Sequence, residues 1–269
     1  MSHPFVDHQA WSKLKQAIVS LAQQEVMTRF NQVGYEIKQD GSLLTEADTS
    51  MQQKMTQLLK REWPEFALLG EESSAETQQA ALEHPTGCWV LDPVDGTTNF
   101  ANHVPFFSVS LALVIGGKPV AGLVYDPARD ELFSARLGLG AELNDQPLKT
   151  PAIYPELKHC VGIIDFKRLA APLATALAIN TPYASQRSFG SVALDWCWIA
   201  SGRGQIYLHG NQSLWDYAAG WLILEEAGGA SCNLDAETVF QNKIGKRSAV
   251  AAINLNTLNL WHSWIQNHH

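Results

Sequence analysis

Four acidic segments of this chain could together hold metal ions or move protons. In the most informative one, an apolar run leads to Asp92, and Asp95 follows three positions later. Two carboxylates this close repel each other and shift their pKa values unless a cation lies between them. Because no His or Cys is nearby, these oxygen ligands suit a hard ion such as Mg²⁺. An Asp-Pro turn followed by an Asp-Gly turn is the purely structural alternative.

The residues directly after Asp95 could bind an anion. Gly96, Thr97 and Thr98 follow it, and their backbone N–H groups would be exposed if a helix begins here. Such groups at a helix start are suited to bind phosphate. The segment therefore combines candidate metal ligands with a candidate phosphate site.

The other three segments place carboxylates where they could join the same site. Glu71 and Glu72 end an apolar run, where a solvated strand end is the structural alternative, above all for Glu72. Thr45 and Asp48 have the spacing of a helix capping box, a structural role that also leaves the carboxylate placed to orient a water. Asp216 opens a helix and could simply compensate the helix dipole.

The elements that must position these residues change in character along the chain. Apolar periodicity predicts helices over 7–29, 46–62, 169–179, 192–201 and 214–227. Strands are expected over 108–115, 119–125, 131–135, 160–164, 205–208 and 249–253, with short apolar runs at 66–69 and 88–91. An antiparallel meander from 108 to about 143, followed by mixed strands and helices, favours a layered α+β fold over a doubly wound sheet. We expect one domain over 1–269, with a soft internal division near residue 150.

Composition excludes several classes of protein. The 269 residues are 46% hydrophobic and 17% charged, which is ample for a buried core. With 27 acidic against 19 basic residues, the net charge of −8 argues against direct nucleic-acid binding. The longest apolar stretch, about 106–115, is too short to span a bilayer, so no membrane association is expected. Four scattered cysteines and the absence of a signal peptide favour a cytoplasmic protein.

The four segments, in this order, resemble the motifs of the inositol monophosphatase family, whose superfamily also holds fructose-1,6-bisphosphatases and bisphosphate nucleotidases. The matching pieces are Lys38…Ser42…Thr45-Glu46-Ala47-Asp48, Gly70-Glu71-Glu72, Asp92-Pro93-Val94-Asp95-Gly96-Thr97-Thr98-Asn99-Phe100 and Trp215-Asp216-Tyr217-Ala218-Ala219-Gly220. The resemblance extends from about residue 10 to 255. It implies a layered αβαβα sandwich and a homodimer.

The resemblance also implies a site for two or three Mg²⁺ ions. One ion would be bound by Glu71, Asp92 and the main-chain carbonyl of Val94. A second would be bound by Asp92, Asp95 and Asp216, so that Asp92 bridges the two. A weaker third would depend on Glu71 and waters. Li⁺ is expected to inhibit by entering a loosely held metal site.

The implied reaction is hydrolysis of a small phosphate monoester by in-line attack of a metal-activated water, without a phosphoenzyme. The implied catalytic residues are Asp48, Thr97 and Glu71. Asp48 and Thr97 match the pair that orients the attacking water, with the carboxylate as proton acceptor. The implied substrate-binding set is Asp95, Gly96, Thr97, Arg187, Gly190, Ser191, Val192, His209 and Asp216.

The segment around Asn99 is most similar to inositol monophosphatases, so an ester like inositol 1-phosphate is the first expectation. Two features depart from the inositol-specific pattern. His209 replaces a Glu that binds sugar hydroxyls, and the stretch 165–168 is short and lacks the usual loop. His209 is either a substrate contact or an ordinary polar residue at the rim. A histidinol-phosphate or 3′(2′),5′-bisphosphate nucleotide phosphatase on the same metal site remains an alternative. A regulatory binding protein with an idle active site is another, because some bacterial family members associate with transcription machinery.

Overall fold

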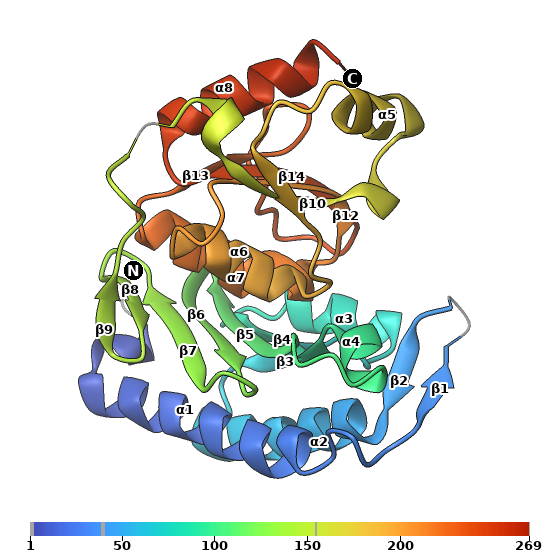
Figure 1. Ribbon diagram of the computed structural model, residues 1–269. Helices are drawn as coiled ribbons and strands as arrows, with labels where there is room; N and C mark the ends of the chain where they lie inside the picture. The colour runs from blue at the N-terminus through green and yellow to red at the C-terminus, as the bar shows by residue number, and fades with distance from the viewer. Residues whose placement is uncertain (1–2, 39–40, 154, 269) are drawn as a thin grey trace.

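Two β-sheets alternate with three layers of helices in the computed structural model, which describes residues 3–38, 41–153 and 155–268 (Figure 1). The larger sheet has seven strands in the order β3-β4-β5-β6-β7-β8-β9, and the smaller has five in the order β11-β10-β12-β14-β13. A separate hairpin, β1-β2, projects from the edge of the molecule (Figure 1). The expected αβαβα sandwich is confirmed.

The strands of the larger sheet are β3 (Ala67–Gly70), β4 (Cys88–Asp95), β5 (Ser108–Ile115), β6 (Lys118–Asp126), β7 (Glu131–Arg136), β8 (Gly140–Leu143) and β9 (Gln146–Leu148). Those of the smaller sheet are β10 (Val161–Asp165), β11 (Ser185–Arg187), β12 (Ile206–Gln212), β13 (Ala230–Cys232) and β14 (Arg247–Ala252). The hairpin is formed by β1 (Tyr35–Ile37) and β2 (Leu43–Thr45). The predicted meander is therefore present as β5, β6, β7 and β8.

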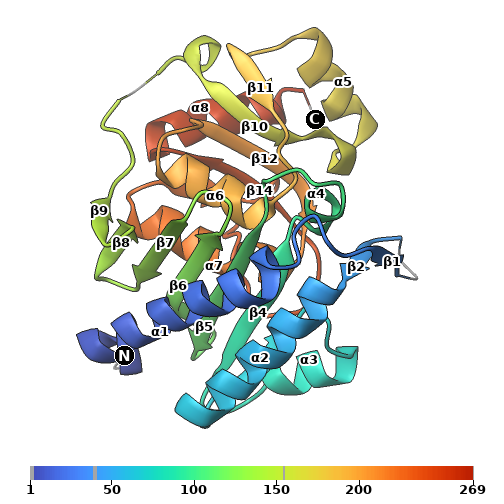
Figure 2. The same cartoon turned by 60° about the horizontal axis from the view of Figure 1, so that its bottom comes forward.

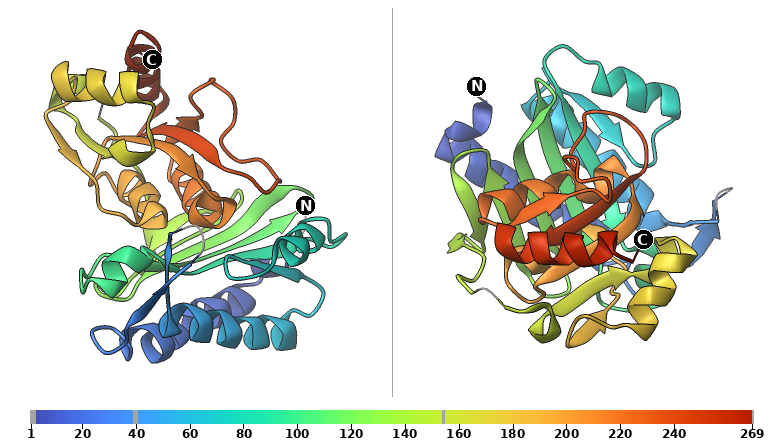
Figure 3. Two further views of the ribbon diagram at one scale, coloured as in Figure 1. Left: turned by 90° about the vertical axis from the view of Figure 1, so that its right-hand side faces the viewer. Right: turned by 90° about the horizontal axis from the view of Figure 1, so that it is seen from above.

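The helices divide into an outer layer on each side and a central pair between the sheets. The eight α-helices are α1 (His8–Leu21), α2 (Glu46–Glu62), α3 (Ala75–Leu82), α4 (Thr97–Ala101), α5 (Ala171–Ile179), α6 (Val192–Ala200), α7 (Leu214–Glu226) and α8 (Leu255–Gln266), counted over the described ranges. Helices α1 and α2 run along the outer face of the larger sheet (Figure 2). Helices α6 and α7 lie between the sheets, and α5 and α8 lie beyond the smaller one (Figure 3).

Each sheet packs against helices on both of its faces, because side chains alternate between the two faces along a strand. Along β4, Trp89 and Leu91 pack with α1 and α2, whereas Cys88 and Val90 pack with α6 and α7. Side chains on a strand point to opposite faces in turn, so Asp92 lies on the same face as Val90, toward the central helices. A third apolar cluster joins α5 and α8 to the smaller sheet. The alternation thus directs a carboxylate into the space between the two halves.

The structure differs from the sequence expectation at some element boundaries. The long helix expected over 7–29 is interrupted, because α1 ends at Leu21 and a π-helical turn occupies Ala22–Met27. Helix α5 begins only at Ala171, after the 3₁₀ turn Phe166–Arg168. Helices α3 and α8 were not predicted. No helix in the described part of the chain has the length and apolar character needed to cross a membrane.

Candidate active site

The end of β4 carries a β-bulge that brings Asp92 and Asp95 to one side of the strand. In the pairing with β5, Asp92 lies opposite Ser110 and Asp95 opposite Ser108, so three steps on β4 match two on β5. Residues three apart would normally point to opposite faces, and the extra residue reverses this. The backbone N–H of Val94 donates to Asp92 Oδ1 at 3.1 Å and stabilises the bulge. The acidic pair is therefore positioned by local backbone geometry.

Asp95 also caps the start of α6, almost a hundred residues later in the chain. Its Oδ2 accepts hydrogen bonds from Ser191 Oγ at 2.5 Å and from the Ala193 N–H at 2.7 Å. Its Oδ1 accepts from the Val192 N–H at 3.1 Å. A carboxylate at a helix N-terminus satisfies free N–H groups and is favoured by the helix dipole. Asp95 thus links the larger sheet to the central helices.

Asp216 is positioned by the first turn of α7. The Ser213 N–H donates to Asp216 Oδ2 at 2.7 Å, and the two residues form a reciprocal capping box. Ser110 on β5 donates from its hydroxyl to the Trp215 carbonyl at 3.2 Å. The start of α7 is therefore attached to the same face of the larger sheet that carries Asp92. Asp216 therefore has the structural role at the start of a helix that the sequence allowed, and the cap does not use its Oδ1.

Glu71 enters the site from the strand beside β4. Strand β3 runs parallel to β4, and the Glu71 N–H donates to the Leu91 carbonyl at 3.1 Å, directly before Asp92. Carboxyl ends of parallel strands meet at one edge of a sheet, where ligands commonly bind. Lys38 Nζ lies 3.4 Å from Glu71 Oε1 and also pairs with Glu72. Both glutamates therefore form ion pairs with Lys38, and Glu71 also contacts Asp92.

Asp48 and Thr97, which the family resemblance pairs, contact each other. Asp48 is the third residue of α2, and its Oδ2 accepts from the N–H and hydroxyl of Thr45 at 2.8 and 2.5 Å, which confirms the capping box. The Thr97 hydroxyl lies 3.2 Å from the free Asp48 Oδ1 and 2.9 Å from the Val94 carbonyl. Gly96, which precedes α4, has a φ of 96° that favours glycine. The structural role of Asp48 thus uses one oxygen and leaves the other for Thr97.

These segments surround one cavity of about 680 Å³. The predicted site residues that line it are Glu71, Asp92, Val94, Asp95, Gly96, Thr97, Gly190, Val192, His209 and Asp216. Asp48 and Ser191 are fully buried behind this wall and reach it through Thr97 and Asp95. A second cavity, of about 640 Å³, lies at the base of the β1-β2 hairpin and has only exposed Glu36 and Glu46 as acidic lining. The chemistry is therefore concentrated in the first cavity.

Burial and mutual repulsion raise the pKa values of the carboxylates in this cavity. Burial, with repulsion from Glu71, Asp95 and Asp216, raises the pKa of Asp92 well above its usual value. Burial likewise raises the pKa of Asp95 and of Asp216 to about 6. Buried carboxylates are costly to ionise unless a cation or hydrogen bonds compensate them. The site therefore contains more buried negative charge than the hydrogen bonds around it compensate.

The donor set fits a divalent hard cation. The predicted ligands are carboxylate and carbonyl oxygens, which is the set that Mg²⁺ prefers. Among the described residues, no three acidic, His or Cys side chains already form a closed metal cluster. Glu71 and Asp92 contact each other, and Asp95 and Asp216 line the same cavity. Bound cations would offset the repulsion between these carboxylates.

Comparison with known proteins identifies the family. The sequence model of the inositol monophosphatase family matches residues 7–266. The chain is 40% identical to inositol monophosphatase 1 of Solanum lycopersicum over 194 residues, 70% of each chain. It is 35% identical to the Nus factor SuhB of Pasteurella multocida over 208 residues, 74% of each. This chain belongs to the inositol monophosphatase family. An IMPase/NADP phosphatase complexed with Mg²⁺ and phosphate superposes with a TM-score of 0.80 at 25% identity, covering 97% of this chain and 94% of that one.

His209 is a buried residue in this inositol monophosphatase family member and not an exposed rim residue. Its side chain is 3% exposed, and its Nε2 lies 3.1 Å from Asp165 Oδ2. Its Nδ1 accepts from the Asn211 N–H at 3.1 Å. One neutral tautomer satisfies both contacts, with Nε2 as donor and Nδ1 as acceptor. His209 therefore lines the cavity with both ring nitrogens already engaged by the protein.

Arg187, unlike the buried Ser191, is a predicted substrate contact that lies on the surface, away from the cavity wall. It ends β11, an edge strand, and its guanidinium donates to Ser185 Oγ at 2.6 Å and to the Gln186 carbonyl at 2.8 Å. The next residue, Ser188, lines the cavity instead. The structure therefore does not bring Arg187 to the site that the family motifs form.

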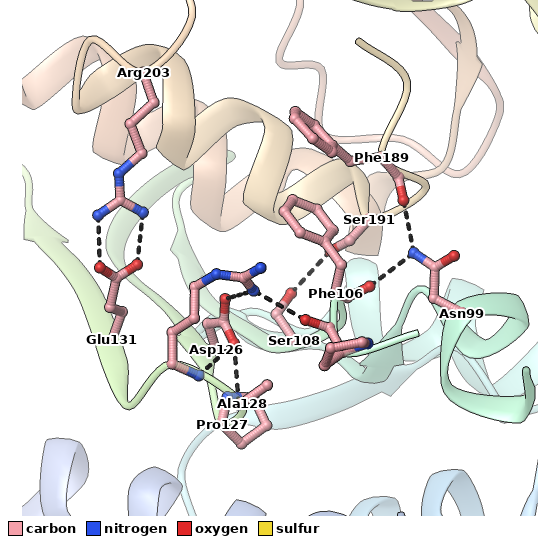
Figure 4. A network of polar contacts seen from close by, with 12 residues as sticks. Asn99, Phe106, Ser108, Asp126, Pro127, Ala128, Glu131, Phe189, Ser191 and Arg203 are labelled. Carbon is pink, nitrogen blue, oxygen red and sulfur yellow. Dashed lines mark hydrogen bonds and ion pairs between the residues drawn. The ribbon is translucent and has the colours of Figure 1, made fainter. Parts of the chain in front are cut away.

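The side-chain amide of Asn99, on α4, links the segment before β5 to the segment before α6. Asn99 Nδ2 donates to the Phe106 carbonyl at 2.8 Å and to the Phe189 carbonyl at 2.6 Å (Figure 4). Ser108 and Ser191 meet beside it at 3.3 Å (Figure 4). Gly190 approaches closely, since a Cβ there would lie 3.2 Å from Asn99 Nδ2. Both walls of the cavity are thus joined by direct hydrogen bonds.

Sequence reasoning missed several residues that shape the site. Ser108 and Ser110 are buried polar residues at alternate positions of an otherwise apolar strand, a signal that was visible in the sequence. Lys246 also lines the cavity, and its Nζ donates to Ser213 Oγ at 2.5 Å. No motif indicated Lys246, because a contact across 33 residues depends on how α7 and β14 pack.

Proposed function

We propose that this protein is a Mg²⁺-dependent phosphomonoesterase that hydrolyses a small phosphate monoester, with inositol 1-phosphate as the representative substrate. The observation that carries the proposal is one cavity in which Glu71 after β3, the buried Asp92 and Asp95 of β4 and the half-buried Asp216 of α7 lie beside the Gly96–Thr98 segment. Membership of the inositol monophosphatase family supports the same reaction class.

Five groups would hold two or three Mg²⁺ ions. They are the carboxylates of Glu71, Asp92, Asp95 and Asp216 and the carbonyl of Val94, all on the cavity wall. Bound there, the ions would acidify a water, bind the phosphate oxygens and neutralise charge on the leaving group. Asp95 keeps one oxygen only lightly hydrogen bonded, since Oδ1 accepts from the Val192 N–H alone. Its role as a helix cap is therefore compatible with a role as a ligand.

Asp48 and Thr97 supply the protein's own proton path. Burial, with the charges of Glu71 and Glu72, raises the pKa of Asp48 to about 6, although hydrogen bonds from Thr45 oppose the rise. A carboxylate of that basicity is suited to accept a proton near neutral pH. The Thr97 hydroxyl has one proton to share between Asp48 and Val94, so its lone pairs remain free to orient a water. The N–H groups of Gly96 and Thr97 would hold the phosphate.

The leaving group of the substrate would contact the wall of the cavity formed by the segments around α6 and β12. Gly190, Ser191, Val192 and His209 would border the leaving group, and a phosphorylated polyol fits a polar cavity of this size. Histidinol phosphate and 3′(2′),5′-bisphosphate nucleotides are the alternatives on the same metal site. We further propose that the protein is a homodimer and that it is cytoplasmic. The four cysteines form no disulfide, which is usual in a reducing compartment.

The purified protein is expected to release phosphate from a panel of small esters only when Mg²⁺ is present. The panel contains inositol 1-phosphate, histidinol phosphate, adenosine 3′,5′-bisphosphate and glycerol 2-phosphate. Chelation should stop release, and readdition of Mg²⁺ should restore it. Millimolar Li⁺ at limiting Mg²⁺ should inhibit. Phosphate release that persists after chelation would contradict the metal assignment, and no release from any ester would contradict the function.

A second candidate function is regulatory binding, which the similarity to a relative named Nus factor SuhB favours. A complementation test in a strain that lacks this protein can distinguish the two functions. If catalysis is the cellular role, the wild type should restore growth and Asp95→Asn should not. Equal rescue by a variant that is folded but inactive would favour the binding role over the phosphatase.

A further inference from the structure

The turn after β10 brings two cations to the wall of the cavity. Strand β10 runs parallel to β12, and Asp165, the last residue of β10, lies opposite His209. The chain then turns through Phe166–Arg168, and Asp165 Oδ1 accepts from the Lys167 N–H at 3.0 Å. Lys167 and Arg168 therefore leave the strand end on a turn that Asp165 holds, and both line the cavity.

Close packing against β12 fixes this turn. A Cβ built on Gly210 would lie 1.8 Å from the Arg168 carbonyl oxygen, so only glycine allows the approach. The Arg168 guanidinium donates to the Asn211 carbonyl at 3.2 Å. A fixed turn holds its charged side chains near the cavity in the free protein, which lowers the entropy lost when a ligand binds.

Asp165, the acidic residue beside these cations, is paired with His209. Asp165 Oδ2 lies 3.1 Å from His209 Nε2 and 4.0 Å from Arg168 Nε. Burial opposes ionisation of Asp165, but the His209 contact and Arg168 hold its pKa below the usual value. Within the described part of the chain, no carboxylate forms an ion pair with Lys167 Nζ. The ammonium group of Lys167 is exposed and available to a ligand.

A third cation reaches the same cavity from the segment before β14. Lys246 is exposed and anchored through Ser213. The carboxylates that would hold Mg²⁺ come from the larger sheet and α7, whereas these three cations come from the turn after β10 and the segment before β14. The cavity wall therefore carries cations as well as carboxylates, with Lys246 next to Asp216 through Ser213 and Lys167 and Arg168 on the turn after β10.

We propose that Lys167, Arg168 and Lys246 bind a second anionic group on the leaving-group part of the substrate. The inference rests on the proposed function, because it assigns the phosphate to the carboxylates that would hold Mg²⁺. A planar guanidinium and two ammonium groups suit a carboxylate or a second phosphate equally. His209 is paired with Asp165 and replaces the Glu that binds sugar hydroxyls in the inositol-specific pattern. The preferred esters are therefore those whose alcohol product carries an acid group.

Two pairs of esters test this preference and separate its two chemical forms. Glycerol 2-phosphate and 2-phosphoglycerate differ by one carboxylate, and inositol 1-phosphate and inositol 1,4-bisphosphate differ by one phosphate. The measured quantity is the ratio of kcat/KM within each pair at fixed Mg²⁺ and pH. We expect the wild type to prefer the anionic member of at least one pair, and the preference to weaken at high salt.

The decisive variant is Lys167→Gln, compared with Lys118→Gln as a matched control. Both remove one exposed lysine charge, but Lys118 starts β6 and does not line the cavity. Lys167→Gln should lower the anionic-to-neutral ratio by about fivefold to tenfold. Lys118→Gln should leave it within about twofold. Equal ratios in wild type and Lys167→Gln, or an equal fall in the control, would overturn the proposal.

A binding measurement keeps this test separate from that of the proposed function. Calorimetry with the non-hydrolysable phosphonate analogues of the two glycerol esters reports affinity without turnover. If no ester is hydrolysed but Lys167→Gln weakens only the analogue with the carboxylate, the subsite stands and the phosphatase assignment fails. If esters are hydrolysed with unchanged ratios, the phosphatase stands and the subsite fails.

Discussion

Asp95→Asn is expected to abolish Mg²⁺-dependent phosphate release and also to lower the stability of the fold. A carboxylate that would bind a metal contributes several kcal/mol to the transition state, so kcat should fall about a thousandfold or more. The amide cannot accept from both sides as the carboxylate does. Its NH₂ group would face either the Val192 N–H or the Ser191 and Ala193 donors. A lost helix cap of this kind costs about 1–3 kcal/mol in the free energy of unfolding.

The matched control is Asp126→Asn. Asp126 is equally buried and accepts from the Ala128 and Arg129 N–H groups, but it does not line the cavity. Steady-state kinetics and thermal unfolding should show both variants destabilised and only Asp95→Asn inactive. Near-normal turnover of Asp95→Asn at saturating Mg²⁺ would show that Asp95 is not a metal ligand.

Asp48→Asn and Thr97→Val are expected to lower kcat by about a hundredfold or more each, and by little more when combined. Proton transfer by a positioned side chain contributes about 10²–10⁴-fold. The side-chain carbonyl of the amide introduced by Asp48→Asn can keep both bonds from Thr45, so the start of α2 should persist. The NH₂ group of that amide would then face the Thr97 hydroxyl and could not accept a proton. Because the two residues would orient one water, removing either should remove most of the shared effect.

A double-mutant cycle on kcat measures this coupling. The control is Asp7→Asn, which alters the cap of α1 and leaves the site untouched. We expect the double variant to lie within about threefold of the slower single variant. Effects that multiply would mean that Asp48 and Thr97 act on separate steps.

Local sequence signals predicted most of the fold and the carboxylate segments that line the cavity, since the information lies within a few residues. The capping box at Asp48, the strand before Asp92 and the helix after Asp216 are all short-range patterns. Helix α8 could have been found as well, because Leu258, Trp261 and Ile265 recur at helical spacing and are buried.

The features that were not predicted depend on contacts between distant parts of the chain. Asp95 caps α6 only because the bulge in β4 meets Ser191, and nothing near either residue indicates this. The pairing of His209 with Asp165 follows from the register of two parallel strands. Arg187 was predicted to contact the substrate but lies away from the cavity wall. A motif shows that a segment is near the site, but it does not show which side chain of that segment faces the site.

The cap on α6 has a consequence for how the molecule opens. Asp95 belongs to the half of the chain before residue 150, and the helix it caps belongs to the half after it. Separating the halves would expose the uncapped N–H groups of Val192 and Ala193 together with a buried carboxylate. We therefore expect the parts of the chain before and after residue 150 to unfold together. Amide hydrogens around Asp95 should exchange only through large-scale unfolding, at a free energy close to that of the whole chain.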